Sequence, residues 1–134
     1  MFRYLFGFIV VTSLACFSEA KELSVETMTP VVLSEHRTRV ARFDQLQPDC
    51  TADVPLVVVT RPPTKGRVEI EEEMGFSLYA KNTPQSKCNN ERTLGVAVFY
   101  TAAPNFKGMD RFEVEVFYTT YAVSQKVKFT ATVK

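Results

Sequence analysis

The stretch Phe99–Val116, FYTAAPNFKGMDRFEVEV, decides the fold of this 134-residue chain. It predicts a strand, a compact turn and a second strand. Pro104 and Asn105 are turn formers, and Gly108 can adopt the positive φ that a tight reversal often needs. Phe106 is too apolar for an idle turn, so we expect it to close one end of a hydrophobic core.

The second half of this stretch has the period of two that is typical of a strand with one buried face. Apolar and charged residues alternate there: Phe112, Val114 and Val116 with Arg111, Glu113 and Glu115. We expect Asp110, at the exit of the turn, to accept hydrogen bonds from backbone N–H groups.

A second strand, Lys126–Lys134, alternates just as cleanly and can be registered against the first. One antiparallel register satisfies both faces, because it pairs apolar residues with apolar residues and acids with lysines. The predicted pairs are Phe112 with Phe129, Val114 with Val127, Glu113 with Lys128, and Glu115 with Lys126.

Two motifs resemble those of bacterial cadherin-like and immunoglobulin-like repeat domains. The first is an aromatic-Tyr-Thr followed by Pro104-Asn105-Phe106-x-Gly108-x-Asp110-x-Phe112-x-Val114, and the second is Pro63-x-x-Gly66-x-Val68. The resemblance covers most of residues 54–118 and implies a β-sandwich in which these residues are structural. It departs from the family in having one copy instead of tandem repeats, and in carrying Ala102 and Ala103 before Pro104. Such domains host many roles, so the resemblance does not specify a function.

The remaining segments predict further strands, and no helix. Leu56–Val59 is a continuous apolar run, which favours a central strand buried on both faces. Residues 81–92 predict a polar loop. The other expected strands are Lys21–Leu33 broken at Pro30, Thr38–Phe43, a segment around Val68 and Ile70, Phe76–Tyr79, and Leu94–Thr101. The fold class is therefore an all-β, immunoglobulin-like sandwich of seven or eight strands.

The first 20 residues have the pattern of a secretory signal. Arg3 precedes an apolar run from Leu5 to Phe17, and small residues place the cleavage after Ala20. The run is short of the roughly 20 residues that span a bilayer, which disfavours a membrane anchor. A lipoprotein would use Cys16, although the Leu of its motif stands one place too late. Residues 21–134 then form one secreted or periplasmic domain.

Removal of the leader leaves two cysteines, Cys50 and Cys88. An even pair in an exported chain predicts a disulfide. Two thiols that far apart, with one histidine in the chain, do not make a zinc site.

Charge and residue types say little about chemistry. The 16 basic and 15 acidic residues nearly balance, which disfavours nucleic acid as a partner. We expect the side chain of His36 to be exposed and to lack partner residues for catalysis. We expect no cofactor. The family resemblance raises calcium as a weak hypothesis with Asp53, Glu73 and Asp110 as ligands, but no Asp-x-Asp spacing supports it.

Tyr118 and Tyr121 stand at the hairpin before the last strand, where they either contact a partner or cap the core. Our first hypothesis is a non-enzymatic exported module that binds a protein or a glycan. The alternatives are an architectural subunit that assembles by edge-strand addition, and a small hydrolase or inhibitor on a β-sandwich.

Overall fold

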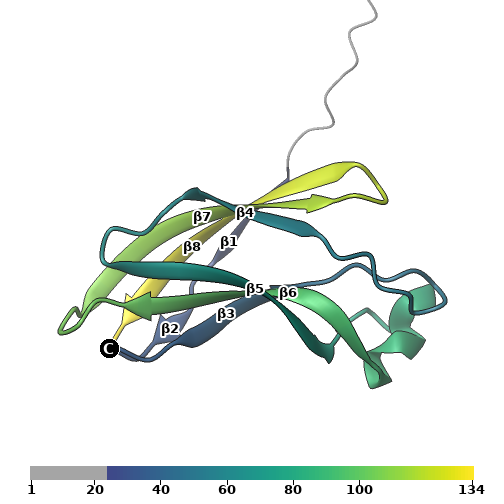
Figure 1. Ribbon diagram of the computed structural model, residues 1–134, viewed down its shortest axis with the longest axis horizontal. Helices are drawn as coiled ribbons and strands as arrows, with labels where there is room; N and C mark the ends of the chain where they lie inside the picture. Colours follow the sequence, from purple (N-terminus) through teal and green to yellow (C-terminus); the bar gives the residue numbers. More distant parts are fainter. Residues whose placement is uncertain (1–23) are drawn as a thin grey trace, which may run out of the picture.

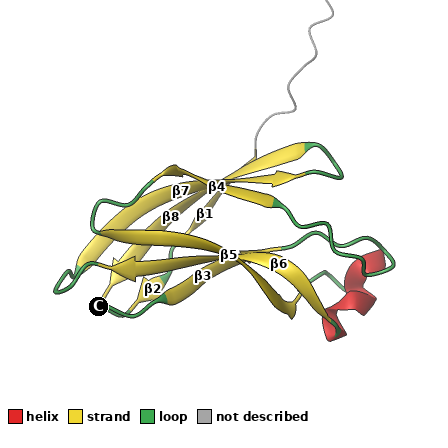
Figure 2. Cartoon of the chain, in the orientation of Figure 1, coloured by secondary structure: helices red, strands yellow, loops and turns green. Residues whose placement is uncertain are grey.

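The computed structural model describes residues 24–134, which form two β-sheets packed face to face (Figures 1 and 2). The predicted leader, its cleavage site and Cys16 lie outside the described residues. The elements are β1 (Ser24–Met28), β2 (Val31–Val32), β3 (Thr38–Phe43), β4 (Leu56–Arg61), β5 (Gly66–Phe76), the 3₁₀ helix η1 (Pro84–Asn90), β6 (Arg92–Ala102), β7 (Gly108–Tyr118) and β8 (Val123–Val133).

The first sheet, sheet A, has the order β1-β8-β7-β4, and β2 also pairs with β8. The second, sheet B, has the order β3-β6-β5. Eight strands in two sheets confirm the predicted all-β sandwich. The break at Pro30 is confirmed too, because β1 and β2 lie on either side of it and both pair in parallel with the edge of β8.

The predicted register of β7 and β8 is confirmed pair by pair. Phe112 lies opposite Phe129 and Val114 opposite Val127, while Glu113 lies opposite Lys128. The aromatic rings of Phe112 and Phe129 stack with centroids 4.5 Å apart, and Tyr100 of sheet B stacks on Phe112 at 5.6 Å. This three-ring stack joins the two sheets.

The core fills the space between the sheets with inward-facing side chains of β2, β3, β4, β6, β7 and β8. Its buried members are Val32, Phe43, Val57, Val96, Val98, Tyr100, Ala102, Phe112, Val114, Val116, Val127, Phe129, Ala131 and Val133.

Asp110 holds together the two turns at one end of the sandwich, which lies at the left in Figure 1. Its buried carboxylate accepts the backbone N–H groups of Thr64 at 3.2 Å and Lys65 at 3.1 Å, and the hydroxyl of Tyr100 at 2.8 Å. The prediction that Asp110 accepts backbone N–H groups is thus correct, but two of these donors belong to the Pro63–Gly66 turn. Asp110 thereby links the two sequence motifs. We call this end of the molecule the turn end.

The other motif residues at the turn end are structural. Gly108 has a φ of 129° and Asn105 a φ of 63°, so both adopt the expected turn conformations. Gly66 is needed for close approach, because a Cβ there would lie 2.6 Å from the carbonyl oxygen of Thr101. Phe106 packs against the core but stays half-buried, so it covers the end of the core without being enclosed in it.

The prediction for Leu56–Val59 is wrong. This run forms β4, which is an edge strand of sheet A. Val57 faces the core, whereas Leu56 and Val58 are 57% and 41% exposed. A continuous apolar run is typical of a strand covered on both faces, but the two-layer sandwich leaves the outer face of sheet A open.

Two further expectations need correction. Residues 76–79 do not form a separate strand, because β5 runs unbroken from Gly66 to Phe76 and Ser77–Tyr79 then leaves the sheet. The predicted polar loop at residues 81–92 contains η1, which begins with Pro84 at its first turn, a position where the missing N–H of proline has no cost.

Candidate functional site

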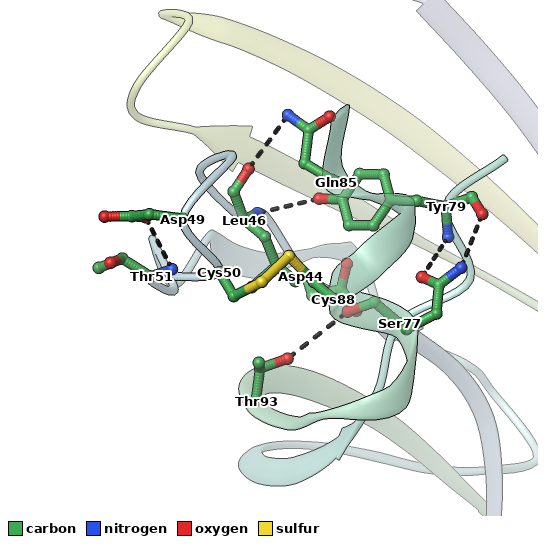
Figure 3. The surroundings of a disulfide bond; sticks show 11 residues. Asp44, Leu46, Asp49, Cys50, Thr51, Ser77, Tyr79, Gln85, Cys88 and Thr93 are labelled. Atoms are coloured by element: carbon green, nitrogen blue, oxygen red, sulfur yellow. Dashed lines mark hydrogen bonds between the residues drawn. A yellow bond between two sulfur atoms is a disulfide. The ribbon is translucent and has the colours of Figure 1, made fainter. Parts of the chain in front are cut away.

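The predicted disulfide braces the end of the sandwich opposite the turn end. Cys50 and Cys88 are joined, with Cα atoms 5.4 Å apart, so the loop after β3 is fixed to η1 (Figure 3). Cys88 is fully buried and Cys50 partly exposed. We call this end the disulfide end; it comprises the loop 44–53, the segment 77–90 and the β7–β8 turn at residues 119–122.

The segment Ser77–Tyr79 is fixed to both sides of the disulfide. The hydroxyl of Tyr79 accepts the N–H of Leu46 at 2.9 Å. Asn89 of η1 accepts the N–H of Tyr79 at 2.9 Å and donates to its carbonyl oxygen at 2.8 Å. These contacts hold an irregular segment in one conformation without a strand partner.

Arg42 of β3 lies across the outer face of sheet B beneath this segment. A Cβ at Gly95 would lie 2.7 Å from its Nη2, and a Cβ at Gly75 would lie 2.8 Å from its Nε, so the two glycines make room for the guanidinium. Arg42 pairs with Asp44 and donates to the carbonyl oxygen of Thr93 at 2.7 Å. The arginine side chain is nine-tenths buried in this position, and its two Nη groups bind neighbouring chain segments while its Nε has no hydrogen-bond partner.

Asp44 completes this network from the opposite side. Its Oδ2 accepts the hydroxyl of Ser77 at 2.8 Å, as well as the guanidinium of Arg42. Ser77 is only 1% exposed, so its hydroxyl cannot reach a substrate in solution. The arrangement is a structural clamp on Ser77–Tyr79, not a nucleophile with its base.

The rest of the outer face of sheet B carries ion pairs that cross β6. Arg37 bonds Glu71 at 2.7 Å and lies 3.5 Å above the ring of Phe99, and Arg39 pairs with Glu73. These interactions pair Arg37, just before β3, and Arg39 of β3 with glutamates of β5.

The β7–β8 turn is fixed to the loop 44–53. Asp53 accepts the hydroxyl of Thr120 and the side-chain amide of Gln47, the latter at 2.8 Å. These hydrogen bonds stabilise the ionised carboxylate and lower the pKa of Asp53. The hairpin that carries Tyr118 and Tyr121 therefore has a defined position at the disulfide end.

A cleft of about 360 Å³ opens among these elements. We call it the aromatic cleft, because phenyl and phenol rings dominate its apolar lining. It is lined by Arg39, Arg42, Phe43, Asp44, Phe76, Leu78, Tyr79 and Tyr118. Burial, followed by the nearby charge of Asp44, raises the pKa of Tyr118 to about 12. The phenol is therefore neutral at physiological pH.

Large apolar side chains surround this cleft in the open. Of the residues that line it, Leu78 is 96% exposed and Phe76 57%. The side chain of Leu78 makes almost no apolar contacts, although hydrogen bonds hold its neighbours Ser77 and Tyr79 in place. A partner could cover these side chains without any rearrangement of the scaffold.

The sequence predicted two contact residues, Tyr118 and Tyr121. Tyr118 lines the cleft, whereas Tyr121 is exposed on the adjoining turn. Sequence reasoning missed Phe76, Leu78 and Tyr79, because their apolar pattern predicted a strand. The only available signal was Gly75, which is tolerated in a strand interior chiefly where another group approaches closely, here Arg42.

The remaining candidates from the sequence do not meet. Asp110 lies at the turn end with its hydrogen bonds described above, Asp53 lies at the disulfide end, and Glu73 pairs with Arg39 on sheet B. Within residues 24–134, no group of three or more His, Cys, Asp or Glu side chains is placed to hold a metal ion. His36 is exposed, as predicted, and lies beside the carbonyl oxygen of Ser34 at 2.9 Å.

Comparison with protein-family models, curated proteins and solved structures finds no significant match to this chain. No helix within the described residues is long and apolar enough to cross a membrane.

Proposed function

We propose that this protein is an exported, non-enzymatic contact module of immunoglobulin-like or cadherin-like type that binds a protein partner at or outside the cell envelope. The two motifs joined by Asp110, the disulfide and the charge-apolar-small pattern of the leader support this proposal. A disulfide contributes most in an oxidising compartment, which fits export.

One observation carries the proposal: Leu78 is 96% exposed at the rim of the aromatic cleft while the segment that bears it is fixed by Tyr79, Asn89 and the Arg42–Asp44 pair. Fully burying a leucine side chain is worth about 1.5–3 kcal/mol. Because the backbone is already ordered, a partner that covers Leu78 and Phe76 gains this energy without a further cost for ordering the backbone.

A protein surface fits better than a glycan. Leu78, the most exposed side chain of the lining, offers a sugar neither a planar ring nor a hydrogen bond, and Arg42 and Asp44 are engaged with each other. Aromatic rings and methionine, by contrast, are enriched at protein–protein interfaces.

The test compares Leu78→Asp with Leu33→Asp, a leucine that is 58% exposed and lies beyond β2, outside the cleft lining. Chemical cross-linking in envelope extracts should yield a protein adduct that Leu78→Asp removes and Leu33→Asp retains, with unchanged melting temperatures for both variants. Binding to a glycan array that depends on Leu78 would favour a glycan partner instead. Adducts that are insensitive to Leu78 would reject the cleft as the contact site.

A hydrolase on the same scaffold makes the opposite prediction. If a glycan, ester or peptide were turned over and Asp44→Asn abolished the activity while the fold remained intact, the contact proposal would be wrong.

A further inference from the structure

A second group of exposed apolar side chains lies away from the disulfide-end cleft, on the outer face of sheet A. Leu56 and Val58 of β4 are 57% and 41% exposed, and Phe117 of β7 is 38% exposed. The β4–β7 register sets Leu56 directly opposite Phe117. These three side chains therefore form one apolar patch, and the patch reaches the edge of the sheet.

The strand at this edge has a free side. Sheet A ends at β4, so one row of its backbone N–H and C=O groups has no strand partner among the described residues. Natural proteins usually protect such edges with charged side chains. The other long edges of the described sandwich follow this rule, since β3 carries Arg39 and Arg42 and β5 carries a run of glutamates.

Within residues 24–134, β4 alone among the edge strands offers five consecutive uncharged residues, Leu56-Val-Val-Val-Thr60. Pro55 and Pro62 bound β4 on either side, so pairing here is limited to a short segment.

We propose that two copies of this chain pair through β4, antiparallel about a two-fold axis at Val58. This register pairs Leu56–Thr60 with itself. It sets Val58 opposite Val58 of the second copy and Val57 opposite Val59, and it places Leu56 beside Thr60, the residue at the bulge of β4. In this register, core-facing residues stay on one face and exposed residues on the other. The two copies of sheet A therefore continue into a single larger sheet.

Neighbouring registers that keep the faces matched are worse. An axis at Val57 would put Pro55 opposite Val59, where proline removes a ladder hydrogen bond. An axis at Val59 would put Arg61 opposite Val57; because the strand is bulged between Val59 and Arg61, Arg61 lies on the other face from Val57. The sequence of β4 is thus self-complementary in one register.

The two-fold axis brings together the apolar patches of both copies on the outer face of the joined sheet. It also uses up the free edge of β4 on each copy, so the contact closes as a dimer and does not propagate into a fibre. A five-residue strand pair buries less than a standard interface, so we expect a weak dimer with a dissociation constant below roughly 1 mM.

Sedimentation equilibrium on residues 21–134, which contain the whole described sandwich, tests the association. Val58→Lys places two ammonium groups against each other on the axis and should raise the dissociation constant roughly tenfold or more. The matched control is Val25→Lys, because Val25 is 59% exposed on β1, at the opposite edge of the same sheet. The control should leave the dissociation constant within about twofold.

Cysteine cross-linking tests the register. Val58→Cys should form an intermolecular disulfide under mild oxidation, because opposite Cα atoms of an antiparallel pair lie about 4.5–5.5 Å apart. Thr60→Cys should not, since its two copies would be about 13 Å apart. The proposal stands only if Val58→Lys weakens the dimer and Val58→Cys cross-links. A monomer up to roughly 1 mM, a dimer indifferent to Val58→Lys, or equal cross-linking through Thr60→Cys would each overturn it.

Discussion

Replacing Asp110 by alanine should destabilise the protein, because hydrogen-bond donors from distant parts of the sequence would lose their acceptor. The carboxylate is 3% exposed and accepts the hydroxyl of Tyr100 and the N–H groups of Thr64 and Lys65. Tyr100 is fully buried, so leaving its hydroxyl without an acceptor should cost about 1–3 kcal/mol. Thr64 and Lys65 are exposed and their N–H groups can regain water, so each should cost about 0.5 kcal/mol. The expected loss in the free energy of unfolding is about 3 kcal/mol.

Urea denaturation of Asp110→Ala, Tyr100→Phe and the double variant measures this loss and its origin. Because Asp110 and Tyr100 share a hydrogen bond, the double variant should lose about 1–2 kcal/mol less than the sum of the single losses. Asp49→Ala is the matched control: that carboxylate is exposed, its hydrogen bond to the N–H of Thr51 is local, and its removal should cost under about 1 kcal/mol. Additive losses, or a loss for Asp110→Ala no larger than the control, would refute the reasoning.

Three further predictions concern the disulfide end. Replacing Cys50 and Cys88 together by alanine should lower the free energy of unfolding by about 4 kcal/mol, from the 38-residue separation that the bond closes, and a urea curve unchanged by the replacement would contradict this. Gly95→Ala should lower stability by about 1–3 kcal/mol in thermal denaturation, because its Cβ would lie 2.7 Å from Nη2 of Arg42; an unchanged midpoint would mean that the guanidinium moves aside freely. Tyr118→Phe should remove the phenol that ionises at about pH 12 in a spectrophotometric titration. Since the folded state raises the pKa of this phenol from 10.0, its contribution to stability is complete below pH 10 and disappears as the pH rises toward 12; complete tyrosine ionisation by pH 10.5 would contradict this.

The parts of the fold that could be predicted are those fixed by neighbours in the sequence. The register of β7 and β8 followed from alternation and opposite charges across a single hairpin, and both faces agreed. The disulfide followed from the count of cysteines left after the predicted leader. The break between β1 and β2 followed from Pro30, which cannot donate to a ladder.

The place of β4 could not be predicted, because a run such as Leu56–Val59 has the same pattern in a central strand as in an edge strand with an apolar outer face. Only the order of strands in the sheet distinguishes the two. That order depends on contacts between residues far apart in the chain.

The aromatic cleft could not be predicted from the sequence for a related reason. Its residues come from β3, the segment after β5 and the end of β7, and no local periodicity connects them. Leu78 and Tyr79 have the composition of a strand, yet hydrogen bonds from Leu46 and Asn89 direct them out of the sheet. Tertiary contacts decided the conformation of this segment against its local preference.

The parallel pairing of β1 with β8 has a consequence for how the chain is made. Ser24 pairs with Gln125, so the first described strand finds its partner only after about 100 further residues have been synthesised. During that time β1 emerges from the ribosome with its backbone groups open to water or to a chaperone. Closing so long a loop is slow, because its entropy must be lost before the contacts form. Completion of sheet A must therefore wait until β8 has been synthesised.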